Sequence, residues 1–300
     1  MRPLIALGVY LIVVFVGAAL LAPSVYHGMQ LAAAHFPFGQ RLAHQPFHRY
    51  VTRCMLIIAL GGIWPLVRFL RLSSLAQIGF AKSDHRRRNL LKGLALGFTS
   101  LAVAAALPLA FGARHLQSGH SGSEILRHLA NAGGAAVAVG CLEELLFRGI
   151  IFGALRESLN WKGAAIISSA LYAIVHFFQR ATASEPIAWN SGFVVLNRML
   201  AGFADGWQLW PGFVNLFLAG LILAFVYEKT GSLYYSIGLH GGWIFWLKSY
   251  GFLTTESDGA SVSFWGSSKL IDGWMALLVL GAVFAMLQRR QFHGDKLKNA

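Results

Sequence analysis

Apolar stretches long enough to cross a bilayer recur along almost the whole chain, and they restrict the fold more than any other feature. A transmembrane helix needs about 20 consecutive apolar residues, because backbone polar groups in lipid must be hydrogen-bonded within the segment. Eight such stretches are predicted at 4–22, 51–70, 90–111, 133–155, 163–178, 211–227, 233–250 and 272–288. The sequence therefore predicts an all-α, polytopic membrane protein with about eight transmembrane helices.

The composition supports this prediction and excludes two broad classes of protein. Hydrophobic residues make up 56% of the chain and charged residues 12%, whereas soluble domains carry roughly 25% charged residues. The 22 Phe and 9 Trp residues also exclude an intrinsically disordered chain. The two cysteines, Cys54 and Cys141, cannot form a disulfide framework, and no CxxC pair is present to bind structural zinc.

Basic residues determine the predicted orientation. With the amino terminus inside, 15 of the 25 Lys and Arg residues fall in inner segments, 9 in outer segments, and Arg148 lies within the membrane. This bias follows the positive-inside rule and places both termini in the cytoplasm. The net charge of +13 and the run from Lys82 to Arg88 are therefore interpreted as an orientation signal beside anionic lipid. No nucleic-acid partner is expected.

Three segments are predicted along the chain. Residues 1–132 contain the first three spans with their loops, 133–250 form the helical core that carries the candidate site, and 251–300 comprise a loop, the last span and a basic tail. The stretch 4–22 is longer than the ~7–15 residues of a cleaved signal core, so an uncleaved first span is favoured over a signal peptide. Residues 112–132 and 179–210 are predicted outer loops. The second is rich in Trp and Phe, so part of it is expected at the membrane interface, with shielding of a lateral opening as the alternative.

Ionisable residues inside a predicted span mark the candidate site. A carboxylate at the centre of a bilayer costs about 2.5–3.5 kcal/mol on insertion scales, so such groups are functional candidates by default. The fourth span contains Glu143, Glu144 and Arg148. Glu144 and Arg148 are four residues apart and share a helical face, whereas Glu143 is rotated by about 100°. We therefore expect arginine to neutralise Glu144 while Glu143 faces a cavity; a purely structural ion pair would leave Glu143 unexplained.

Two histidines lie within predicted spans beyond the first helical turn, His176 in the fifth span and His240 in the seventh. Counted from the inner ends of the spans at about 1.5 Å per residue, Glu143 and His176 lie at roughly 20 Å and His240 at roughly 12 Å. A lone buried histidine is usually a packing residue. Two histidines in a chain that also buries two glutamates favour a functional site.

A glutamate with two histidines supports two chemistries. As a general base, Glu143 would activate water while the histidines orient that water or donate to the developing oxyanion. As metal ligands, the two histidines and one or two glutamates would bind zinc with an open position. The chain has no HExxH zinc motif, which weakens the metal interpretation without removing it. No cofactor is therefore expected, and zinc is the alternative.

Three runs of residues together resemble a known family. They are Glu143 to Arg148 (EExxxR), Tyr172 to His176 (aromatic-xxxH), and a histidine segment that extends from Phe217–Gly220 through Tyr227–Leu233 to Ile237–His240. In this order and spacing, over about 133–247, the sequence is similar to the CAAX-protease and bacteriocin-processing (CPBP, or Abi) family of intramembrane proteases. The resemblance implies an eight-helix fold, a site that opens between spans four to seven, and peptide-bond hydrolysis by a glutamate-activated water.

The resemblance also implies a role for each matching residue. Glu143 would be the general base, His176 would help to hold the water, His240 would stabilise the oxyanion, and Glu144 and Arg148 would support the site. The family and the lack of an organelle signal imply a multi-pass protein of the plasma membrane, such as a bacterial inner membrane. The expected partners are lipid and a membrane-associated or lipophilic peptide or protein substrate, rather than a prenylated CAAX protein.

Two positions depart from the family pattern. Tyr172 stands where the family has phenylalanine, a change that keeps the aromatic ring. Ile244 stands four residues after His240, where the family often has an asparagine that assists at the oxyanion. Trp243 and Asn215 are candidates for a replacement donor, and the substitution Ile244→Asn is expected to be tolerated and to raise turnover.

Other functions find less support in the sequence. The run Gly119-His120-Ser121-Gly122 matches the GxSG of rhomboid-type serine proteases, but it lies in a predicted polar loop. A transporter would be expected to contain inverted repeats, and none is evident. The main alternative is a non-catalytic membrane scaffold or immunity protein that binds a partner on the same fold, which the Ile244 departure suggests. The presence of Glu143, His176 and His240 favours the protease.

Overall fold

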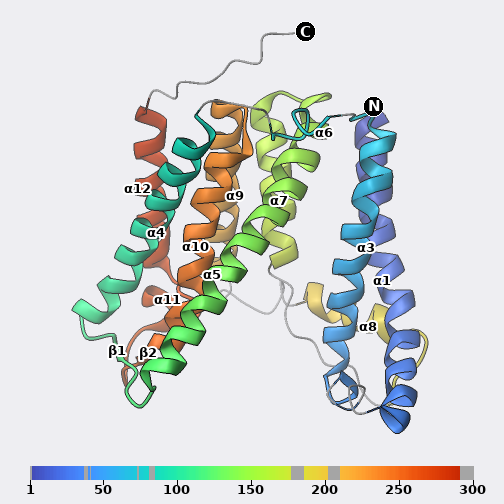
Figure 1. The fold of residues 1–300 in the computed structure, drawn as a ribbon, viewed down its shortest axis with the longest axis horizontal. Coiled ribbons are helices and arrows are strands. Elements are labelled where there is room, and N and C mark those ends of the chain that lie inside the picture. Colours follow the sequence, from blue (N-terminus) through green and yellow to red (C-terminus); the bar gives the residue numbers. More distant parts are fainter. Residues whose placement is uncertain are drawn as a thin grey trace. The chain divides into compact units, whose positions relative to one another are not determined.

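A computed structural model describes residues 2–36, 40, 42–72, 74–80, 85–176, 186–201 and 210–290. These residues are predominantly helical, as predicted, with one antiparallel pair of short strands (Figure 1). The helices are α1 (Arg2–His35), α3 (Phe47–Phe69), α4 (Arg86–Ala110), α5 (Gly122–Glu144), the π-helix η1 (Leu145–Phe152), α6 (Gly153–Arg156), α7 (Trp161–His176), α8 (Ser191–Ala201), α9 (Trp210–Thr230), α10 (Leu233–Leu253), α11 (Val262–Trp265) and α12 (Trp274–Arg289), and the strands are β1 (Arg114–Leu116) and β2 (Thr254–Glu256).

Within the described ranges, four helices are long and apolar enough to cross a membrane: α1, α3, α4 and α9. They coincide with the first, second, third and sixth predicted spans. The other predicted spans also coincide with helices, namely α5 continued by η1 and α6, then α7, α10 and α12. The chain is thus a multi-pass membrane protein, whereas the count of eight spans and the cytoplasmic location of the termini remain predictions.

The first compact unit comprises residues 1–73 and 178–206, and its helices α1, α3 and α8 pack on one another. Tyr10 of α1 donates a hydrogen bond to the carbonyl of Ala59 in α3 at 2.9 Å. Helix α1 continues to His35, so it is longer than the span predicted at 4–22. Pro23 lies inside the helix, and membrane helices tolerate proline because local adjustments and neighbouring helices satisfy the freed backbone groups.

Several predicted features fall partly or wholly outside the described residues. Of the second outer loop, 179–210, the structure describes 186–201, which contain α8 and the exposed side chain of Trp189, and Trp210, the first residue of α9. The remainder of that loop, Lys82 in the basic run, and the basic tail at 291–300 lie outside the described residues. The interfacial location of the loop therefore stays a prediction.

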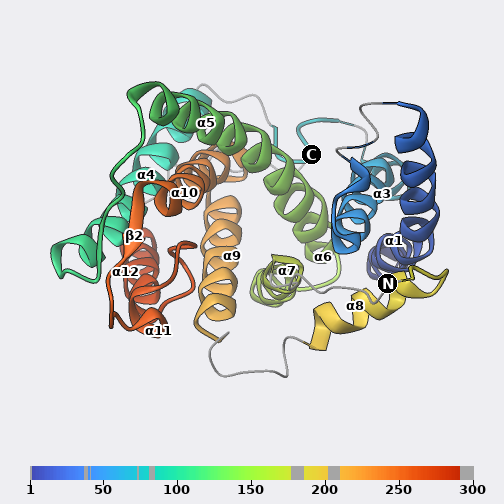
Figure 2. The ribbon, with the colours of Figure 1, turned by 90° about the horizontal axis from the view of Figure 1, so that it is seen from below.

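The second compact unit comprises residues 74–177 and 207–300 and is built around α10. This helix packs against α4, α5 and α9, and α9 packs in turn against α7 and α12 (Figure 2). Glycines allow α4 and α10 to approach closely: a Cβ on Gly93 would lie 2.1 Å from the carbonyl oxygen of Tyr235, and one on Gly238 would lie 2.1 Å from that of Leu90. Small residues at membrane helix interfaces permit this kind of packing, and it fixes the position of α10 in the unit.

The predicted outer loop 112–132 is shorter than expected, because α5 begins at Gly122. Ser121 caps the helix: its hydroxyl accepts from the backbone N–H of Glu124 at 3.3 Å, and its own N–H donates to the Glu124 carboxylate at 2.8 Å. This is a capping box, and its S-x-x-E pattern is present in the sequence. Ahead of the cap, β1 pairs with β2, with Arg114 opposite Glu256.

The substitution Ser121→Ala should lower stability without affecting peptide cleavage. Loss of an N-cap hydroxyl costs about 0.5–2 kcal/mol, which thermal unfolding in detergent would detect. The backbone amide and hydroxyl of Ser121 hold the pKa of Glu124 below its ordinary value of 4.5. The folded protein therefore binds a proton at Glu124 more weakly than the unfolded chain does. The stabilisation that this carboxylate contributes is present at neutral pH and is lost as the pH falls below 4.5. A folded Ser121→Ala variant without any cleavage activity would instead support a serine nucleophile.

Candidate active site

A buried ion pair forms the base of the candidate site. Nη1 of Arg148 donates to Oε1 of Glu144 at 2.9 Å, and the side chains are 2% and 0% exposed. The expected pairing of Glu144 with Arg148 is therefore present, although Arg148 lies in η1, four residues beyond the end of α5. The switch from α- to π-helix immediately after Glu144 was not evident from the sequence; such π segments are frequent at functional sites.

Arg148 also connects this pair to α9. Its Nη2 donates to the carbonyl oxygen of Gly220 at 3.3 Å. A side chain at Gly220 would be obstructed, because a Cβ there would lie 2.8 Å from Cβ of Ser169 in α7. The glycine thus allows α7 and α9 to pack closely and at the same time leaves its carbonyl accessible to the guanidinium.

His240 of α10 extends the buried network. Its Nδ1 lies 2.9 Å from Oε1 of Glu144, the same oxygen that accepts from Arg148. A carboxylate paired with arginine is a hydrogen-bond acceptor, so Nδ1 of His240 carries a proton and donates. This assignment fixes the ring and leaves Nε2 directed towards Glu143 and Tyr172.

Glu143 and His176 form the more accessible part of the site. Nε2 of His176 lies 3.2 Å from Oε2 and 3.3 Å from Oε1 of Glu143, and the side chains are 24% and 29% exposed. Nδ1 of His176 donates to the carbonyl of Tyr172 at 2.8 Å, which leaves Nε2 for Glu143. The contact between the carboxyl group and Nε2 therefore needs one shared proton, carried by either partner.

The two histidines converge on Glu143. Nε2 of His240 lies 3.8 Å from Oε2 of Glu143, the same oxygen that lies 3.2 Å from Nε2 of His176. The depths counted from the sequence placed His240 at a lower level, and this difference does not come from the start of its span, because α10 begins at Leu233 as predicted. All five residues that the sequence singled out are thus brought together from α5, η1, α7 and α10.

Tyr172 contributes a polar contact that the sequence analysis missed. Its hydroxyl lies 3.2 Å from Nε2 of His240, and the residue is only 4% exposed. The guanidinium of Arg148 lies over its ring at 4.8 Å from the centroid, which fixes the orientation of the phenol. The replacement of phenylalanine by tyrosine therefore changes the chemistry of the site and not only its packing.

The two replacement donors suggested from the sequence are engaged elsewhere. The indole N–H of Trp243 donates to the hydroxyl of Ser100 at 3.0 Å. Nδ2 of Asn215 donates to the carbonyls of Ile271 and Gly273, each at 2.8 Å. Both suggestions were wrong, because position in the sequence does not reveal which buried polar group a side chain reaches.

The donor set does not fit a zinc site in this conformation. Among the described residues, no group of three or more His, Cys, Asp or Glu side chains is arranged to hold a metal ion. The two imidazole nitrogens that zinc would require both have protein partners, Nε2 of His176 at Glu143 and Nε2 of His240 at Tyr172. Metal binding would require both contacts to break.

One comparison with known proteins gives a match. Residues 125–246 match the family described as "Rce1-like: Type II CAAX prenyl endopeptidase Rce1-like". This range contains all three motifs and every candidate site residue, and it confirms the resemblance drawn from them. No curated protein and no solved structure is significantly similar to the chain.

Proposed function

We propose, from the match of residues 125–246 to the Rce1-like CAAX proteases, that the chain is an intramembrane endopeptidase that uses a glutamate-activated water. The observation that carries the proposal is the convergence of His176 and His240 on Glu143, at 3.2 Å and 3.8 Å. The Glu143 carboxylate is partly exposed and lies close to two imidazoles. Such a group is suited to acid–base chemistry on a bound peptide.

Glu143 is the proposed general base. Its Oε2 is buried and makes no hydrogen bond of good geometry with any described residue, so this oxygen could accept the proton of a water that enters the site with the substrate. Glu143 would take that proton as the water oxygen attacks the peptide carbonyl, and would then deliver it to the leaving amine. His176, in contact with the same carboxyl group, would hold the water in line with the carbonyl carbon.

His240 and Tyr172 are the proposed donors to the developing oxyanion. Glu144 and Arg148 fix the ring of His240 through Nδ1–H. When the imidazole is doubly protonated, Nε2–H would donate towards the reacting carbonyl oxygen. The hydroxyl of Tyr172 lies beside that nitrogen and supplies the second donor in place of the asparagine that is absent at Ile244. Donors held in place before the reaction stabilise charge without reorganisation.

The substrate class and the setting are inferred less directly. A site on membrane helices favours a membrane-associated or lipophilic peptide or protein as substrate, and a plasma membrane of bacterial type as the location. The proposed mechanism itself requires no cofactor.

Cleavage of a quenched library of membrane peptides by the purified full-length protein tests the proposal. The library should contain lipidated and unlipidated members, and each reaction should run with and without a chelator. We expect cleavage that the chelator leaves unchanged. Loss of cleavage with the chelator and recovery with zinc would contradict the glutamate mechanism and make Glu143, His176 and His240 ligands. If the folded protein cleaves no peptide in detergent or in bilayers, the non-catalytic scaffold suggested by Ile244 becomes the better interpretation.

A further inference from the structure

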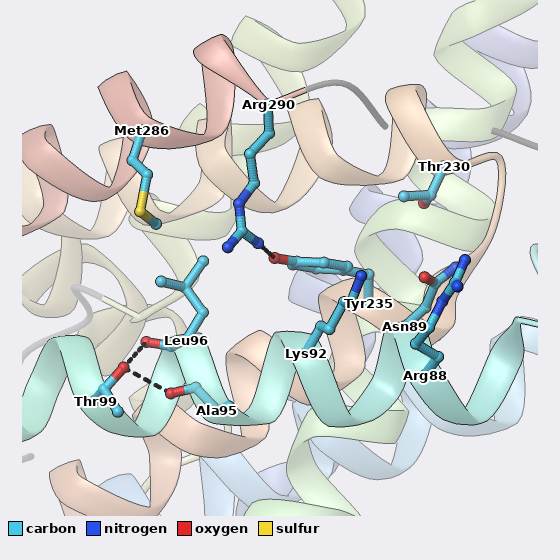
Figure 3. Close-up of a pocket in the computed structure, with 10 residues that line it drawn as sticks. All are labelled: Arg88, Asn89, Lys92, Ala95, Leu96, Thr99, Thr230, Tyr235, Met286 and Arg290. Carbon is cyan, nitrogen blue, oxygen red and sulfur yellow. Dashed lines mark hydrogen bonds between the residues drawn. The ribbon is translucent and has the colours of Figure 1, made fainter. Parts of the chain in front are cut away.

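A basic cavity lies between α4 and α12, at the end of the second unit where α4 begins and α12 ends. It has a volume of about 480 Å³ and is lined by Arg88 and Lys92 of α4 and by Arg290, next to the end of α12 (Figure 3). Of the residues that the structure describes, no acidic one lines it. Within the described ranges, Arg88 and Lys92 form no ion pair, and Arg290 donates only to the hydroxyl of Tyr235, at 3.3 Å.

An apolar groove of about 420 Å³ continues from this cavity between the same two helices. The cavity and the groove share Leu96, Thr99 and Met286. The hydroxyl of Thr99 donates to backbone carbonyls of its own helix, at 2.7 Å to Ala95 and 3.3 Å to Leu96, so this polar group is satisfied within α4. Leu278, which also lines the groove, is 66% exposed.

On both walls of the groove the side chains change from basic to apolar in the same direction. Along α4, Lys92 is followed at helical spacing by Leu96, Thr99 and Val103, and along the antiparallel α12, Arg290 is preceded by Met286 and Ala282. From Lys92 to Val103 the helix rises by about 16 Å, close to half of a ~30 Å hydrocarbon core. A cationic head with an apolar tail of one leaflet's depth matches the shape of a phospholipid.

We propose that this cavity and groove bind one anionic phospholipid, with the phosphate among Lys92, Arg290 and Arg88 and an acyl chain between α4 and α12. Basic pockets between transmembrane helices bind anionic lipid headgroups in this way. The site is separate from Glu143 and its partners, and its occupation is measurable without proteolysis.

Native mass spectrometry of the full-length protein, titrated with dioleoyl phosphatidylglycerol in detergent, tests the proposal. We expect a saturable single-lipid adduct for the wild type and at least tenfold weaker binding of dioleoyl phosphatidylcholine. The double variant Lys92→Gln/Arg290→Gln should bind phosphatidylglycerol about thirtyfold more weakly, since each basic residue near an anionic lipid surface contributes about a factor of five. Arg87→Gln removes a charge from the same turn without lining the cavity and should leave the affinity unchanged.

A second pair of variants tests the groove while it keeps every charge. Ala282→Trp would fill the groove and should weaken binding of phosphatidylglycerol at least tenfold, whereas Ala285→Trp, which does not line the groove, should have no effect. Equal affinity for phosphatidylcholine, wild-type affinity in the charge variant or in Ala282→Trp, or equally tight competition by glycerol 3-phosphate would each overturn the proposal. The last result would mean a simple anion site.

Discussion

Replacement of Glu143 by glutamine is expected to reduce peptide cleavage by about 10²–10⁴-fold, the usual contribution of a general acid–base group, while the protein stays folded. The amide has nearly the same shape as the carboxyl group and still offers an oxygen to Nε2 of His176, which lies 3.3 Å from Oε1. It cannot accept the proton of the attacking water. The loss should therefore appear in kcat, with little change in KM.

A matched variant separates loss of the base from general damage. Glu157→Gln makes the same chemical change at an exposed residue just after α6 and should leave cleavage unchanged. Thermal unfolding in detergent should give similar midpoints for both variants and the wild type. If folded Glu143→Gln retains more than half of the wild-type rate, another group must activate the water.

The polar residues of the site were predictable from the sequence because a polar or charged side chain within a membrane span is costly and therefore rare. Glu143 and Arg148 in an apolar stretch signal function by their cost alone, and the four-residue spacing correctly predicted the contact of Glu144 with Arg148. The histidines followed from the same argument. Which atoms meet was not predictable, since the contacts of His240 depend on how closely α10 packs against its neighbours.

The helices were predictable in position but not in extent. Hydropathy identifies where an apolar helix lies, yet α1 runs on to His35 and α5 starts at Gly122 because propensity and capping, not hydropathy, determine where a helix ends. The π-helix η1 leaves no pattern in the composition of residues 145–152. The buried Arg148 lies in this segment. Its contact with the carbonyl of Gly220 depends on the tertiary structure, which the sequence pattern does not show.

Tyr172 shows a different limit of the sequence. Taken alone, the change from phenylalanine to tyrosine looks conservative, and the change from asparagine to Ile244 looks like a loss. The structure brings the Tyr172 hydroxyl to 3.2 Å from Nε2 of His240. In the proposed mechanism the two departures belong together, as an exchange of one oxyanion donor for another.

Substitution of Tyr172 by phenylalanine is accordingly expected to lower kcat by about 10²–10³-fold, the effect of removing one oxyanion donor. The ring, its contact with Phe147 and the position of the Arg148 guanidinium over it would all remain. KM should change little, because the hydroxyl acts on charge that develops only in the transition state. Unchanged kcat in the folded variant would remove Tyr172 from the mechanism and leave the hydroxyl as a packing partner of His240.

The double variant Tyr172→Phe/Ile244→Asn restores the family's pattern at both positions and provides the decisive comparison. Ile244 lies one helical turn beyond His240 on α10 and is 5% exposed, so an asparagine there would be buried on the side of the helix that carries the histidine. An unpaired buried amide costs about 1–3 kcal/mol, so Ile244→Asn alone should lower the unfolding midpoint. Contrary to the expectation from the sequence alone, it should not raise kcat while the Tyr172 hydroxyl is present at His240. In the double variant the amide should assume the role of the lost hydroxyl and raise kcat at least tenfold above that of Tyr172→Phe. A folded double variant no faster than Tyr172→Phe would mean that the two positions serve His240 in different ways, and that tyrosine here is not a substitute for asparagine.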